Sequence, residues 1–97
     1  AHTNQKSNQK LKINKMENYR KVNGWNFEFV SQDDGNDQFY QCRGEVMYDD
    51  EHDQIPEPSL WKASLILEKQ LNQEGYNCEA SHSEKGWVEV NVYSKKQ

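Results

Sequence analysis

One stretch of the chain, Pro58–Gly75, combines helical periodicity with a clear beginning and end. Proline suits the first position of a helix because its missing N–H has no partner there, with Glu57 before it or Ser59 as the alternative cap. Gly75 is typical of the residue that follows a helix. The core face of the helical wheel consists of Leu60, Ala63, Ser64, Leu67 and Leu71. This stretch therefore predicts an amphipathic helix that lies against another apolar layer.

The same wheel places Trp61 and Leu65 in a second apolar stripe, well round from the core face. Lys62, Lys69 and Gln73 fall opposite the core face and are predicted to face water. An apolar stripe on the surface of a small domain marks a contact unless something covers it. We therefore expect Trp61 and Leu65 to contact the N-terminal segment, a second copy of the chain or a partner protein.

Four segments outside the helix have the alternating pattern of strands: residues 25–29, 39–48, 76–81 and 87–93. Ser31–Asp37 is rich in residues that tolerate positive φ, and it predicts the loop of a hairpin. Gly44 predicts a bulge or a close approach of backbone. Met16, Tyr19 and Val22 have helix-like spacing and predict a short helix near residues 16–22.

The order of these elements predicts an α+β fold of the ββαββ type, with a β-hairpin before the helix and another after it. An antiparallel sheet with one helix across a face is the economical packing of such a chain. The predicted domain is 23–97, preceded by a basic polar arm at 1–22 that is a tag, a linker or partly helical. The order of the central strands stays open. Beneath the helix we expect Val88, Val90, Val92, Tyr76, Cys78, Trp25, Phe27 and Phe29.

The net charge of −4 conceals a division between the arm and the domain. Residues 1–22 carry six Lys and Arg against one Glu, which is +5, and residues 23–97 carry −9. A basic arm on an acidic domain suits binding to nucleic acid or membrane phosphates, but it also suits an arm lying on its own domain or in solvent. The basic residues of the arm are Lys6, Lys10, Lys12, Lys15, Arg20 and Lys21.

Several features of the sequence bear on the compartment. No apolar run approaches the roughly 20 residues of a membrane span. The lack of a visible signal peptide favours the cytoplasm, whereas the start at Ala1 also fits a processed export signal. Cys42 and Cys78 would form a disulfide if they lay on neighbouring strands of an exported protein, and would be buried thiols in the cytoplasm. The absence of an N-glycosylation sequon fits a bacterial or phage origin.

The acidic segment Asp49–Asp53 contains four carboxylates and one imidazole, which are ligands that metals use. Asp49, His52 and Asp53 are the candidate metal ligands, but the spacing lacks the calcium-loop pattern. A solvated loop or an acidic patch for a partner is the simpler interpretation, and we prefer the patch. No cofactor is expected. Cys78 and His82 are four residues apart on a strand, roughly 13 Å, and no catalytic motif is present, so we do not expect an enzyme.

The chain is expected to be a small acidic protein-binding module of the inhibitor, immunity or adaptor type. Its partner is expected to be another protein or a second copy of the chain, met by exposed aromatics and by acidic loops that include Asp33–Asp37. The predicted partner-binding residues are Trp61, Leu65, Phe39, Met47, Trp87, Tyr93, Asp49, Asp50, Glu51 and Asp53. The alternative is a nucleic-acid-binding protein that uses the basic arm and an aromatic sheet face.

Overall fold

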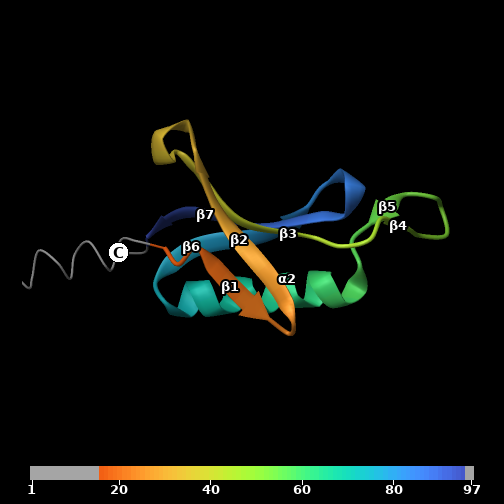
Figure 1. The fold of residues 1–97 in the computed structure, drawn as a ribbon, viewed down its shortest axis with the longest axis horizontal. Coiled ribbons are helices and arrows are strands. Elements are labelled where there is room, and N and C mark those ends of the chain that lie inside the picture. The colour runs from red at the N-terminus through yellow and green to blue at the C-terminus, as the bar shows by residue number, and fades with distance from the viewer. Residues whose placement is uncertain (1–15, 96–97) are drawn as a thin grey trace, which may run out of the picture.

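The computed structural model describes residues 16–95 and shows an α+β fold, with a curled antiparallel sheet, a helix and a second, smaller sheet (Figure 1). The strands of the large sheet are β1 (Tyr19–Val22), β2 (Trp25–Gln32), β3 (Asp37–Arg43), β6 (Tyr76–His82) and β7 (Trp87–Lys95). The small sheet consists of β4 (Met47–Tyr48) and β5 (Gln54–Ile55). The helix is α2 (Pro58–Gln73), and two 3₁₀ turns are η1 (Asp33–Gly35) and η2 (Glu84–Gly86).

The helix begins and ends as the sequence predicts. Pro58 occupies the first turn, Glu57 is the N-cap without a side-chain hydrogen bond, and α2 ends two residues before Gly75. Its buried side chains are Leu60, Ala63, Ser64, Leu67 and Leu71, which is the predicted core face. Ser64 is satisfied because its hydroxyl donates to the Trp61 carbonyl at 2.6 Å. The apolar periodicity of Pro58–Gly75 therefore matches the face of the helix that is buried.

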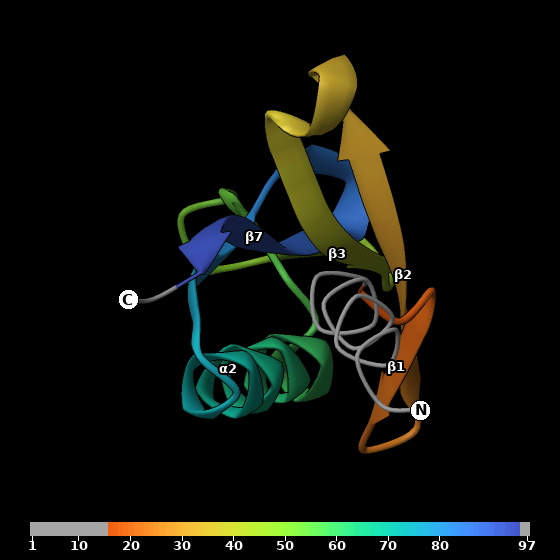
Figure 2. The same ribbon diagram turned by 90° about the vertical axis from the view of Figure 1, so that its left-hand side faces the viewer.

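The large sheet has the strand order β1-β2-β3-β7-β6, and all its neighbours are antiparallel. The order joins the two predicted hairpins through β3 and β7, with Tyr40 opposite Val90. The strands curl around α2, which contacts both edge strands, β1 and β6 (Figure 2). The buried core between the layers consists of Val22, Phe27, Tyr40, Val88, Val90 and Val92 together with the helix face.

The predicted helix near residues 16–22 is wrong, because Tyr19–Val22 is strand β1. Asn23 and Gly24 have φ values of 50° and 86°, and they form the two-residue turn that pairs Val22 with Trp25. Such a turn matches the twist of the two strands it joins, so β1 and β2 continue as a paired hairpin on either side of it. The sheet thus begins inside the segment assigned to the arm. Residues 1–15 lie outside the described part of the chain.

The predicted strand at residues 39–48 is interrupted at Gly44. Strand β3 ends at Arg43, and the chain leaves the large sheet to form the hairpin of β4 and β5. The Gly44 N–H donates to the Gly86 carbonyl at 2.9 Å. The close approach of backbone predicted at Gly44 is therefore confirmed, and it redirects the chain before Met47 and Tyr48.

The edge strand β6 is partly covered by the helix. The Glu68 carboxylate accepts a hydrogen bond from the Ala80 N–H at 3.3 Å, and the Glu68 carbonyl accepts one from the Cys78 thiol at 3.4 Å. Strand β6 also contains an irregularity in register between Asn77 and Cys78. These contacts attach the edge of the sheet to α2.

Candidate functional site

The candidate site is the hairpin end of the molecule, which consists of the β4–β5 hairpin, η2 and the last residues of β6. Figure 1 shows the hairpin projecting away from the helix and the large sheet. It is attached at its base, where the Glu57 carboxylate accepts a hydrogen bond from the Glu45 N–H at 3.1 Å. Gln54 attaches the other strand, since its side-chain oxygen accepts from the Lys85 N–H at 2.8 Å. A two-stranded hairpin is marginal alone, so these contacts fix its position.

The acidic turn at the tip is organised by Asp49. One oxygen of its carboxylate accepts hydrogen bonds from the Glu51 and Asp53 N–H groups, both at 2.9 Å. The Asp49 backbone exchanges further bonds with His52 and Asp53 at 3.0 Å. The left-handed conformation of His52, with φ of 66°, completes the turn. The carboxylate that sequence analysis assigned to a partner or a metal therefore holds its own loop.

Asp49, Glu51 and Asp53 bring carboxylate oxygens within 4.8 Å of one another, so they are the described residues that could hold a hard cation. His52 of the predicted metal set does not belong to this group. One Asp49 oxygen already accepts two backbone N–H groups. The geometry is that of an acidic turn, and its chemical capacity is to attract positive charge.

Two large apolar side chains of the hairpin are exposed to solvent. Tyr48 is 57% exposed and Val46 is 39% exposed. Val46 lies in the segment that leads into β4, two residues before Tyr48. Met47, which sequence analysis named instead, is half-buried opposite Ile55. An exposed aromatic beside a cluster of carboxylates is the main surface feature of the hairpin.

A small pocket lies where the hairpin meets the large sheet. It has a volume of about 210 Å³, opens to solvent and is lined by Gln54, His82, Ser83 and Glu84. Gln54 is the register partner of Tyr48, and such partners lie side by side on one face. Trp61 presents its ring to His82 edge-on, with centroids 5.4 Å apart and an interplanar angle of 89°. The pocket therefore connects the hairpin to the predicted Trp61 stripe.

Leu65, the second residue of that stripe, is 41% exposed. The structure thus separates the pair, since Trp61 is half-buried against β6 and Leu65 faces solvent. The other predicted aromatics lie on the outer face of the sheet, which is the face turned away from α2. Trp87 is half-buried with the Arg43 guanidinium 5.7 Å from its ring centroid.

Phe39 and Tyr93 also belong to the outer face. Phe39 is only 8% exposed, because it lies on the central strand β3 between Val30 and Asn91 of its neighbours. It is therefore not available to a partner in this fold. Tyr93 is 65% exposed, and its hydroxyl donates to the Glu79 carboxylate at 3.4 Å. The outer face and the hairpin end are separate surfaces, and the predicted residues do not form one patch.

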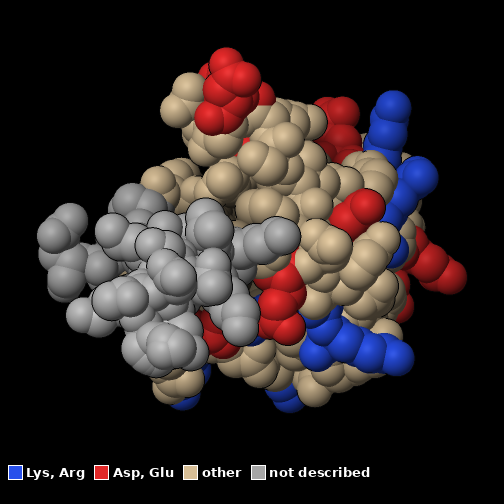
Figure 3. Space-filling model, turned by 60° about the vertical axis from the view of Figure 1, so that its left-hand side comes forward, with Lys and Arg blue, Asp and Glu red and all other residues tan. Residues whose placement is uncertain are grey.

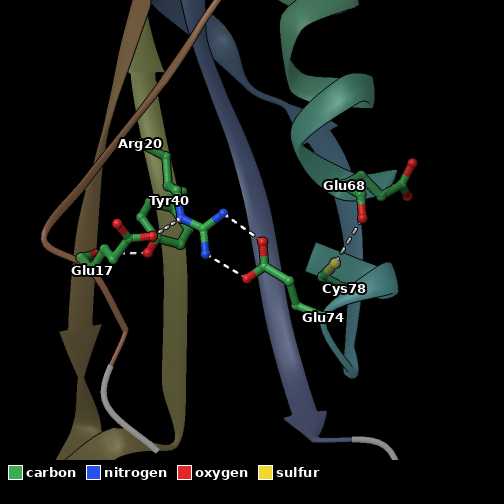
Figure 4. A network of polar contacts seen from close by, with 6 residues as sticks. All are labelled: Glu17, Arg20, Tyr40, Glu68, Glu74 and Cys78. Atoms are coloured by element: carbon green, nitrogen blue, oxygen red, sulfur yellow. Dashed lines mark hydrogen bonds and ion pairs between the residues drawn. The ribbon is translucent and has the colours of Figure 1, made fainter. Parts of the chain in front are cut away.

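The six predicted basic residues are also not found together in the described part of the chain. Lys6, Lys10, Lys12 and Lys15 lie outside the described residues, and Lys21 is exposed on β1. Arg20 makes two hydrogen bonds to the Glu74 carboxylate, at 2.9 and 2.6 Å, and an ion pair with Glu17 at 2.7 Å (Figure 4). The Tyr40 hydroxyl donates to the Glu17 carbonyl at 2.6 Å. Arg20 therefore joins β1 to the end of the helix.

Glu74 stands at the C-terminal end of α2, where the helix dipole disfavours a negative charge. The hydrogen bonds from Arg20 offset this and lower the pKa of the Glu74 carboxyl. A carboxyl group whose pKa is lowered in the folded state stabilises the fold at pH values above its ordinary pKa. This stabilisation is lost as the pH falls through the folded-state pKa. The stabilisation is that of an ion pair screened by solvent, since the Glu74 side chain is 43% exposed.

Replacing Glu74 with glutamine is expected to lower the free energy of unfolding by about 0.5–1 kcal/mol at neutral pH. The difference from wild type should vanish at acidic pH, because Glu74 is then protonated in both states. Urea denaturation across this pH range measures both effects. The control is Glu28→Gln, at an exposed carboxylate on β2. Equal losses in the two variants would contradict this role of the Arg20 pair.

Cys42 and Cys78 are thiols that are not joined to each other in a disulfide. They lie on β3 and β6, and β7 runs between these strands. Two strand spacings separate the backbones by roughly 9–10 Å, beyond the reach of a disulfide. The condition for the disulfide, that the cysteines lie on neighbouring strands, is therefore not met. Burial raises the pKa of the Cys42 thiol, which is consistent with an unreactive group.

Comparisons with protein-family models, curated proteins and solved structures found no match to this chain. Among residues 16–95, no helix is long and apolar enough to cross a membrane. Function is therefore inferred from the surface of this molecule. The amino-acid sequence did not single out Tyr48, Val46 or the pocket. Gly44 was the available signal for these two side chains. If the strand ends at Gly44, the alternation that buries Tyr40 no longer applies to Val46 and Tyr48.

Proposed function

We propose that this chain is a protein-binding module that acts by contact and not by catalysis. The observation that carries the proposal is the projecting β4–β5 hairpin, with an exposed tyrosine beside an acidic turn. Tyrosines are enriched among the residues that dominate protein interfaces, because they bury a large area with little loss of side-chain entropy. Carboxylates around such an anchor accelerate the approach of a basic partner.

Charge supports the same proposal. Residues 16–95 contain sixteen Asp and Glu against seven Lys and Arg, a formal charge of −9. Figure 3 shows further carboxylates at the tip of the β2–β3 hairpin, where Asp33 and Asp34 lie. A surface of this sign repels phosphate backbones, which disfavours the nucleic-acid alternative for this part of the chain. The partner that it fits is a protein with a basic surface.

Replacing Tyr48 with alanine is expected to weaken capture of the partner at least tenfold, since truncating an interface anchor costs about 2 kcal/mol or more. The measurement uses the full chain as bait in extracts of its own organism, with the captured protein then titrated against each variant. The matched control is Tyr19→Ala, because Tyr19 is 56% exposed and Tyr48 is 57% exposed. Tyr19 lies on β1, away from the hairpin.

Two outcomes would contradict the proposal. Equal affinity of wild type and Tyr48→Ala would show that the hairpin is not the binding surface. Recovery of nucleic acid in place of a protein, lost as salt rises, would favour the alternative function. Recovery of the chain itself would identify the partner as a second copy. Tyr48 is exposed, so the substitution is expected to leave the fold intact.

A further inference from the structure

The size of the pocket at the hairpin end limits what it can hold. Its volume is about 210 Å³, and Gln54, His82, Ser83 and Glu84 line it. Cavities that bind metabolites and drug-sized molecules are larger, about 300–1,000 Å³. The pocket is also open to solvent, so a side chain of a bound protein can enter it from outside. These dimensions fit one side chain of a bound protein better than a free small molecule.

The chemistry of the lining favours a cation that donates several hydrogen bonds. Glu84 supplies a carboxylate, which when ionised only accepts hydrogen bonds. Ser83 offers a hydroxyl oxygen. The Gln54 side-chain oxygen accepts from the Lys85 N–H at 2.8 Å and keeps a second lone pair. Three of the four lining residues therefore carry side-chain acceptors.

His82 adds an aromatic ring to the lining residues. This ring also contacts Trp61, with centroids 5.4 Å apart. Planar guanidinium groups stack on aromatic rings and carry five N–H donors, whereas an ammonium is a compact charge with three. An imidazole ring and several acceptors among the lining residues thus suit arginine better than lysine.

Charges of both signs flank the pocket, because Lys85 follows the lining residue Glu84 in the chain. Asp53 immediately precedes Gln54, and its carboxylate belongs to the cluster with Asp49 and Glu51. The nearby Arg43 guanidinium is already in use, because its Nε donates to the Lys85 carbonyl at 2.9 Å and its charge lies over Trp87. The formal charge of −9 on residues 16–95 nevertheless attracts a cation arriving from a partner.

We propose that this pocket receives an arginine side chain of the partner protein. The guanidinium donates to the Glu84 carboxylate, and its remaining N–H groups face Ser83 and Gln54. This inference rests on the proposed function and gives the partner a chemical identity, a basic segment that presents an arginine. Tyr48 then contacts the same segment beside the pocket.

The test is a titration of the full chain with three end-blocked Gly-X-Gly peptides, followed by the backbone amide signals in NMR spectra. X is arginine, lysine or citrulline. The arginine peptide is expected to shift the amides of Gln54, His82, Ser83 and Glu84. The lysine peptide should bind several-fold more weakly, and the neutral citrulline peptide should produce no shifts at the same concentration.

Glu84→Gln is expected to weaken binding of the arginine peptide roughly tenfold, the size expected for a hydrogen bond to a charged group. The matched control is Glu79→Gln, because Glu79 is an exposed carboxylate on β6 outside the pocket. Both positions are exposed, so the variants should fold as wild type does. Equal binding by the two variants, or equal binding of lysine and arginine, would overturn the proposal.

The test separates this inference from the proposed function. If Glu84→Gln still captures the partner with full affinity while Tyr48→Ala does not, the hairpin is the interface and the arginine pocket is wrong. If the arginine peptide binds at the pocket and both variants lose the partner, the inference and the proposed function are supported together. Shifts spread over the whole acidic surface would mean non-specific attraction and would also overturn the pocket.

Discussion

Replacing Gly86 with alanine is expected to reduce the free energy of unfolding by about 3 kcal/mol or more. Gly86 has a φ of +83°, and a left-handed conformation costs a residue with a side chain about 1–2 kcal/mol. A Cβ atom there would also lie 2.4 Å from the Gly44 carbonyl oxygen, which is backbone and cannot rotate away. Overpacking of this kind adds about 1–3 kcal/mol.

Gly24→Ala is the matched control for this prediction. Gly24 has nearly the same φ, +86°, but nothing lies within 4 Å of an added Cβ. It therefore isolates the conformational effect, and the expected loss is about 1–2 kcal/mol. Chemical denaturation of both variants measures the difference. If Gly24→Ala were as damaging as Gly86→Ala, the close crossing of Gly44 and Gly86 would not be the cause.

Leu67→Ala is expected to cost about 2–5 kcal/mol, because Leu67 is fully buried between α2 and the sheet. The same substitution at Leu65 serves as its control. Leu65 is on the same helix and has the same chemistry, but it is 41% exposed, so its loss should be below about 1 kcal/mol. Equal losses would contradict the placement of the two side chains, and denaturant midpoints provide the comparison.

The helix was the most predictable part of this fold, because every local signal in it agrees. Pro58 starts it, Gly75 follows its end, and the spacing of its leucines matches the buried face. The strands around Phe27 and Val90 were predictable for the same reason, since their alternation records one buried face. Where pattern and burial coincide, the amino-acid sequence is sufficient.

Strand β1 was not predictable from periodicity, because four residues cannot distinguish a strand from a helical turn. Its pairing with β2 follows from the Asn23-Gly24 turn, which brings Val22 opposite Trp25. The β4–β5 hairpin was also missed. It depends on the crossing of Gly44 with Gly86, a contact between residues 42 positions apart that no local pattern records.

The candidate site was predicted in part. Trp61 and the acidic turn were both singled out in the sequence, and they lie on either side of the pocket wall formed by His82 and Gln54. Tyr48 was not singled out in the sequence, because it shares the parity of Tyr40 if the strand is continuous. The pocket itself requires two segments that only the folded chain brings together.

The hydrogen bond from Ala80 to Glu68 has a consequence for how this protein behaves at high concentration. The free edges of sheets are templates for pairing with other chains, and β6 is such an edge. Glu68 occupies one of its N–H groups with a charged side chain of the helix. The opposite edge, β1, has only four residues and carries Arg20 and Lys21. Both edge strands of the sheet thus have features that disfavour pairing with a second chain. The exposed tyrosines can therefore serve recognition without exposing an open sheet edge to aggregation.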